Sequence, residues 1–145
     1  DAATPTPEAV VEPTPETSAL RTTVSELQAI IDEMYAQRGA YTLLNVYWTE
    51  ASTTGTGGCT AQISLDQIPA NYELAADLQG NADLSLTVNL VNTGLQFLRQ
   101  GWEQFASACA RNETVAQAVS GLQVTASAKT AFDSANTQLG LLRGT

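Results

Sequence analysis

One apolar seam limits what this chain can fold into more than any other feature. Alternating spacings of four and three residues connect Leu84, Val88, Val91, Leu95, Leu98, Trp102, Phe105 and Cys109. This heptad spacing places all of them on one side of an α-helix, whereas a strand would scatter them over both faces. Gly94 and Gly101 lie within the run and each weaken a helix by about 1 kcal/mol relative to alanine, so we expect them to allow close packing. The seam predicts a long, buried helix.

The first half of the chain repeats this pattern. The same spacing connects Leu20, Val24, Leu27, Ile31 and Met34. Thr17 or Ser18 can cap the start of this helix, and Gly39 can end it. Segment 41–50 is ambiguous, because its Tyr, Thr, Val and Trp residues suit a strand while its apolar positions continue a helical stripe. We favour the helix there.

A looser helical stripe marks the last third of the chain. It runs through Val115, Val119, Leu122, Ala126, Phe132, Leu139 and Leu142. Asn112 is a good N-cap in front of it. Upstream of the seam, Ser64 and Gln67 fit a capping box, which favours a further helical element over 65–79. The sequence therefore predicts an all-α fold, an antiparallel bundle of three to four helices over residues 17–145.

Residues 1–16 differ in composition from the rest of the chain. They read DAATPTPEAVVEPTPE and hold four of the five prolines and four of the fifteen acids. Repeated prolines favour extended backbone, so we expect an extended Pro/Thr-rich N-terminal arm. The arm is either a surface spacer or an assembly arm that docks on a neighbouring copy. The docking residues would be Val10, Val11, Glu8, Glu12 and Glu16. The arginines available as partners are Arg21, Arg38, Arg99, Arg111 and Arg143.

Two features are typical of an exported protein. Cys59 and Cys109 have a spacing that fits no metal motif, and an even cysteine count in such a chain predicts one disulfide. Free thiols and a redox pair are the alternatives. Asn112 also opens the sequon Asn-Glu-Thr and is a candidate N-glycosylation site. We therefore expect an extracellular or cell-surface location.

Charge and composition argue against several classes of function. The net charge is −9, with six basic residues and no histidine. Nucleic-acid binding needs clustered Lys and Arg, and histidine is the commonest general base and metal ligand, so we expect no nucleic-acid partner and no catalytic, metal or cofactor site. No apolar run is long enough to predict membrane insertion. The acid pairs Asp32–Glu33 and Asp77–Asp83 are most simply solvated helix faces.

Three hypotheses about function follow. The first is a non-catalytic exported structural protein that self-associates with other copies of itself into an extracellular or surface assembly, such as a filament. The alternative is an extracytoplasmic helical binding module that presents a groove to an unknown ligand or protein partner. Aromatic residues that could line such a groove are Tyr35, Tyr41, Tyr47, Trp48 and Tyr72, although core packing is the simpler interpretation. The third, an enzyme using carboxylates alone, has the least support.

Overall fold

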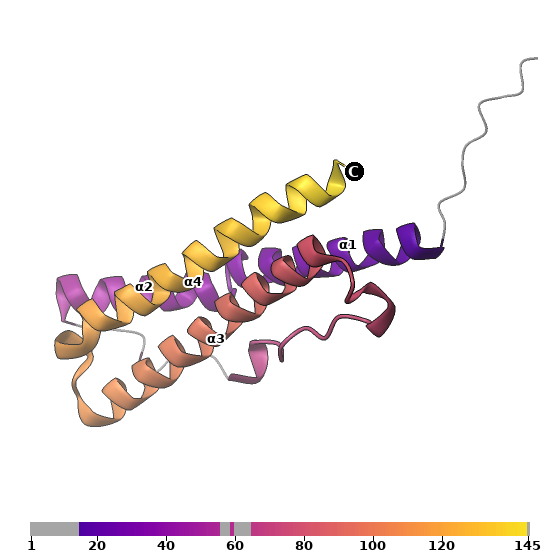
Figure 1. The fold of residues 1–145 in the computed structure, drawn as a ribbon. Coiled ribbons are helices and arrows are strands. Elements are labelled where there is room, and N and C mark those ends of the chain that lie inside the picture. The colour runs from indigo at the N-terminus through magenta and orange to yellow at the C-terminus, as the bar shows by residue number, and fades with distance from the viewer. Residues whose placement is uncertain (1–14, 56–58, 60–64, 145) are drawn as a thin grey trace, which may run out of the picture.

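The computed structural model describes residues 15–55, 59 and 65–144 (Figure 1), and within this part of the chain every regular element is helical. The helices are α1 (Pro15–Tyr35), α2 (Ala40–Thr54), α3 (Ala82–Arg111) and α4 (Thr114–Arg143), with short 3₁₀ turns at Leu65–Gln67 and Ala76–Leu78. The all-α prediction is confirmed, as is the helix over 41–50. Most of the predicted arm lies outside the described residues. In the described part of the chain, no helix has both the length and the apolarity needed to cross a bilayer.

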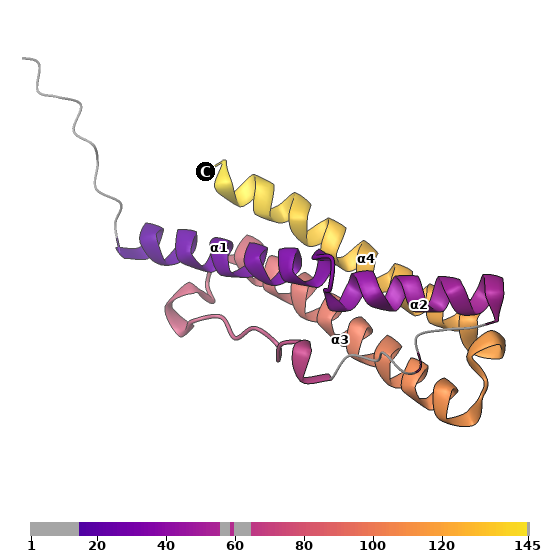
Figure 2. The same ribbon diagram turned by 180° about the vertical axis from the view of Figure 1, so that it is seen from behind.

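Helices α1 and α2 follow one another almost end to end and form one broken rod (Figures 1 and 2). Helix α1 begins at Pro15, earlier than the predicted caps, because proline suits the first helical position. Gly39 was predicted to end α1. Instead, α1 ends at Tyr35 and Gly39 immediately precedes α2. A Cβ atom at Gly39 would overlap the carbonyl oxygens of Glu33 and Met34, so only glycine lets the chain turn this closely past the end of α1.

The bundle is not antiparallel throughout. Helix α3 runs in the same direction as the α1–α2 rod, and only α4 runs the opposite way (Figures 1 and 2). This direction requires a long crossover segment, residues 55–81, between α2 and α3. The prediction of a helical element over 65–79 is wrong except for the two 3₁₀ turns, and its proposed cap Ser64 lies outside the described residues.

Side chains of α3 fix the crossover segment in place of a helical hydrogen-bond ladder. The amide of Asn92 accepts from the backbone N–H of Tyr72 at 2.7 Å and donates to its carbonyl at 3.0 Å. Arg99 donates to the Pro69 carbonyl at 2.7 Å. Because these polar groups satisfy the backbone of an irregular segment, the crossover can lie against the bundle without forming a helix.

Helices α3 and α4 form a long antiparallel hairpin, and the predicted seam makes its core. Seven of the eight seam residues are buried, and Cys109 is half-buried. The expectation for the glycines of α3 is confirmed. A Cβ at Gly94 would lie 2.5 Å from Cε1 of Phe132, and one at Gly101 would lie 2.6 Å from Cδ2 of Leu44. Both glycines therefore make room for large side chains of neighbouring helices.

The predicted stripe on α4 is partly wrong. Val115 and Val119 are 58% and 68% exposed, and Ala126 is exposed as well. The buried positions in the first half of this helix are small: Thr114, Ala118, Gly121, Thr125 and Ala128. At Gly121 a Cβ would overlap the indole of Trp48, which is fully buried. The bulk of Trp48 forces small residues to face it, and the larger valines lie on the opposite side.

Candidate functional site

The predicted disulfide is present in the structure. Cys59 and Cys109 are joined with a Cα–Cα distance of 5.6 Å and an Sγ–Sγ distance of 2.12 Å. The bond links the crossover segment to the last turn of α3, so neither sulfur is a free thiol. Its role in this fold is to hold a long connection against the helical hairpin.

Asn112 lies at the corner between α3 and α4 and is exposed. It was predicted to be the N-cap of α4, but the structure makes it the C-cap of α3. Its backbone is left-handed, with φ 57° and ψ 42°, and its N–H donates to the carbonyls of Ala108 and Cys109. Asparagine tolerates this conformation better than most residues, so it ends the helix. Glycosylation at Asn112 stays a prediction.

The paired acids do not form a site. Asp32, Glu33, Asp77 and Asp83 are all exposed. Asp32 accepts a hydrogen bond from the Gln28 amide at 2.9 Å. No three His, Cys, Asp or Glu side chains come together as metal ligands anywhere in the described ranges. These carboxylates lie on solvated helix faces.

All five aromatic residues singled out from the sequence pack in or against the core. The rings of Tyr35 and Tyr41 have centroids 4.5 Å apart, and the ring of Tyr47 stacks on Phe105 at 5.7 Å. Burial raises the pKa of Tyr35, and the neighbouring Tyr41 adds to that shift. Their packing agrees with the core interpretation.

Tyr72 lies apart from the other aromatic residues, on the crossover segment. Its O–H donates to Glu26 of α1 at 2.5 Å. Together with Asn92 of α3, which holds its backbone, this bond joins the crossover to two different helices. The role of Tyr72 in the structure is therefore to hold the crossover in position.

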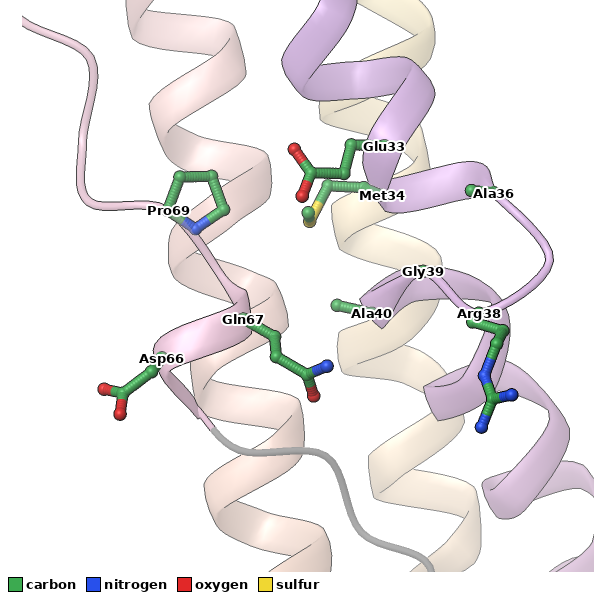
Figure 3. Close-up of a pocket in the computed structure, with 9 residues that line it drawn as sticks. All are labelled: Glu33, Met34, Ala36, Arg38, Gly39, Ala40, Asp66, Gln67 and Pro69. Atoms are coloured by element: carbon green, nitrogen blue, oxygen red, sulfur yellow. The ribbon is translucent and has the colours of Figure 1, made fainter.

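A pocket of about 350 Å³ lies where the α1–α2 turn faces the 3₁₀ turn Leu65–Gln67 (Figure 3). Its charged side chains are Glu33, Arg38 and Asp66. In Figure 3 these three do not converge, because the side chains of Asp66 and Arg38 extend outward on opposite sides of the pocket. The pocket has the size of a small-molecule site but no set of charged groups aimed at one point.

The outward side of the α3–α4 hairpin is apolar and uncovered by any described element. A groove of about 420 Å³ runs between the two helices, with Leu90 and Phe97 on one wall and Ala126 and Thr130 on the other. Three exposed side chains continue this surface, because helical spacing places each on the same side as a residue of the groove. Leu86 lies four residues before Leu90, Val119 seven residues before Ala126, and Leu141 eleven residues after Thr130. We call these seven residues the outer hairpin face.

This face is also almost free of charge. Between Asp83 and Glu103, helix α3 contains only Arg99, whose guanidinium is bonded to the crossover. Between Glu113 and Arg143, helix α4 contains only Lys129 and Asp133, which pair with each other at 2.6 Å. The long uncharged stretches of both helices are visible in the sequence, but the face that they form together was not predicted from it.

A second pocket of about 350 Å³ lies at the end of the bundle where α1 begins and α4 ends. Its apolar side chains are Leu20, Val24 and Leu142, and its charged ones are Arg21 and Arg143. We call it the end pocket. It contains two of the six basic residues of the chain.

The predicted docking residues of the arm are not brought to any site by the structure. Glu8, Val10, Val11 and Glu12 lie outside the described residues. Glu16 falls in the first turn of α1 rather than in an arm. Comparison with protein-family models, curated proteins and solved structures finds no match to the chain.

Proposed function

We propose that this protein is a non-catalytic structural subunit that self-associates into an extracellular or surface assembly. The observation that carries the proposal is the outer hairpin face, which is mostly apolar, contains no charged residue and is not covered by any described part of the chain. Protein interfaces are depleted in charged residues at their centre and enriched in large apolar ones. A second copy that packs its own outer hairpin face here would complete a four-helix arrangement, since each copy contributes two antiparallel helices.

The charge of the chain decides which face can meet a second copy. Each copy carries a net charge of −9, so contacts that bring acidic faces together are repelled. The α1–α2 rod has exposed acids along its length, Glu26, Asp32, Glu33 and Glu50. The seven residues of the outer hairpin face include no carboxylate, and the charge of the nearby Asp133 is offset by its pairing with Lys129, which favours this face as the surface between identical subunits.

Export is the second part of the proposal. The disulfide between Cys59 and Cys109 is a type of bond that persists in oxidising compartments, and the sequon at the exposed Asn112 suits the same environment. An assembly outside the cell depends on stable subunits, and the disulfide contributes to that stability by closing a long loop.

Sedimentation velocity of the full chain tests the proposal, with one charge added to the outer hairpin face. Val119→Glu introduces a carboxylate at an exposed position, so the helix stays folded while the contact between copies is lost. Val46→Glu is the matched control, because Val46 is also an exposed valine but lies on α2. We expect assemblies for the unmodified chain and for Val46→Glu, and monomers for Val119→Glu. A monomeric unmodified chain, or equal assembly of the two variants, contradicts the proposal.

The alternative function, a helical binding module, has its support in the pocket at the α1–α2 turn, whose volume of about 350 Å³ is in the range of small-molecule sites. A chain that stays monomeric at all concentrations would favour this alternative. Shifts of amide resonances near Met34 and Gly39 on ligand addition would then identify the pocket as the site.

A further inference from the structure

We propose that the acidic N-terminal arm of one copy docks in the end pocket of a neighbouring copy. The inference rests on the proposed self-association and assigns it a second contact. The end pocket lies between the first turns of α1 and the last turn of α4, and Val24 and Leu142 form its buried apolar part. Arg21 and Arg143 add positive charge to the same pocket.

The two arginines are available to an acidic partner. Among the described residues, neither guanidinium forms an ion pair. Arg143 is held in place, because its Nη2 donates to Oε1 of Gln28 at 2.6 Å. Gln28 is itself bonded to Asn136 of α4 at 3.2 Å and to Asp32 of α1 at 2.9 Å. A guanidinium that is already positioned loses less side-chain entropy when it binds a carboxylate.

Two other arginines of the chain, Arg99 and Arg38, fit the role less well. Arg99 is occupied by the Pro69 carbonyl and the Asn71 side chain. Arg38 lines the pocket at the α1–α2 turn together with the acids Glu33 and Asp66, which would repel an acidic arm. The end pocket combines an apolar surface with two arginines and has no acid among its described lining residues.

The arm has the complementary chemistry. Val10 and Val11 form an apolar pair, and Glu8 and Glu12 stand close on either side of it. An apolar pair flanked by two carboxylates matches an apolar pocket that is also lined by two arginines. Ion pairs with such groups orient the segment, while burial of the valines supplies most of the binding free energy.

The position of the arm's attachment argues for the pocket of a neighbour. Helix α1 begins at Pro15, and Thr17 lines the end pocket, so the arm leaves its own copy beside that copy's pocket. Pro13 and Pro15 oppose a reversal of the chain direction between Val11 and α1. An extended proline-rich chain would place Val11 about 12 Å from the start of α1. An arm extended in this way would be directed toward another subunit and not back onto its own pocket.

Photo-crosslinking of the full chain tests the proposal. The probe p-benzoylphenylalanine replaces Ala9, which leaves the acids and valines of the arm intact. Copies labelled with ¹⁵N and unlabelled copies are mixed, crosslinked and examined by mass spectrometry. We expect crosslinks from the arm to peptides spanning 17–25 and 139–143, with one labelled and one unlabelled partner. Crosslinks confined to single copies, or to other parts of the bundle, overturn the proposal.

Substitutions in the pocket give a second readout. The double variant Arg21→Gln, Arg143→Gln should lower the crosslink yield by about fivefold to tenfold, as expected for the loss of two partly exposed ion pairs. Arg38→Gln, the matched control, should leave the yield unchanged. An unchanged yield in the double variant overturns the assignment of the pocket.

Sedimentation of the same samples separates the two proposals. Assembly without crosslinks at the end pocket refutes only the arm's docking site. A monomeric full chain refutes the self-association on which that site depends.

Discussion

Gly121 and Gly140 lie on the same helix, and replacing each by alanine should change stability in opposite directions. A Cβ at Gly121 would lie 2.5 Å from Cζ2 of Trp48 and closer still to two other ring atoms. The indole cannot move aside easily, because it is fully buried and the ring of Phe105 packs against it at 5.0 Å. At Gly140, by contrast, a Cβ meets no atom within 4 Å.

The magnitudes follow from these contacts. Overpacking a rigid core costs about 1–3 kcal/mol, and the overlap with several ring atoms places Gly121→Ala near the upper end of that range. Alanine also improves helix propensity by about 1 kcal/mol at either position. We therefore expect Gly121→Ala to lower the free energy of unfolding by about 2 kcal/mol and Gly140→Ala to raise it by about 1 kcal/mol.

Urea denaturation followed by far-UV circular dichroism measures both variants under the same conditions. Tryptophan fluorescence provides an independent probe of the packing around Trp48. If the two substitutions shift the unfolding midpoint in the same direction, the close approach of α2 to α4 is not as tight as described, and the reasoning from the glycine contacts fails.

Four further predictions concern single features of the fold. Replacing both Cys59 and Cys109 by serine should lower the free energy of unfolding by about 4 kcal/mol, measured by urea titration, because the loop between them spans 50 residues. Tyr35→Phe should stabilise the protein by about 1 kcal/mol in the same assay, since the buried hydroxyl of Tyr35 has no hydrogen-bond partner among the described residues. Tyr72→Phe should destabilise the protein by about 1 kcal/mol, through loss of the bond to Glu26. Stability should fall as pH rises above 10, the ordinary pKa of tyrosine, because burial raises the pKa of Tyr35 and the unfolded state therefore releases that proton first. The urea midpoint should fall less steeply between pH 9 and 11 for Tyr35→Phe than for the unmodified chain. An identical slope would contradict the prediction.

The long seam of α3 could be predicted from sequence because its residues are large, apolar and regularly spaced. The same holds for α1, where Leu27, Ile31 and Met34 are all buried. Such positions bury apolar area whichever partner they meet, so the pattern alone identifies them.

Helix α4 could not be predicted in the same way. Its orientation depends on Trp48, a residue far away in the sequence, which admits only small side chains opposite it. Hydrophobicity ranks Val119 above Gly121, yet Gly121 is buried and Val119 is exposed. A pattern based on large apolar residues cannot detect a contact such as that of Gly121 with Trp48, which requires a residue without a side chain.

The crossover and the candidate surfaces depended on tertiary contacts as well. Asn92 and Arg99 read as ordinary polar positions of an amphipathic helix, and nothing local indicates that they hold the backbone at Pro69 and Tyr72. The end pocket joins residues from both ends of the described chain, Leu20 and Leu142 among them. Only the fold brings these together.

The disulfide also sets how the molecule responds to a pulling force. A load applied through Pro15 and Gly144 acts on two points at the same end of the bundle, so it peels α1 and α4 apart from that end instead of sliding them past each other. The covalent path between these points crosses directly from Cys59 to Cys109. The chain between the two cysteines therefore carries no tension and adds nothing to the extended length. Under such a load, most of the crossover and of α3 would remain unstretched while α1, α2 and α4 unravelled.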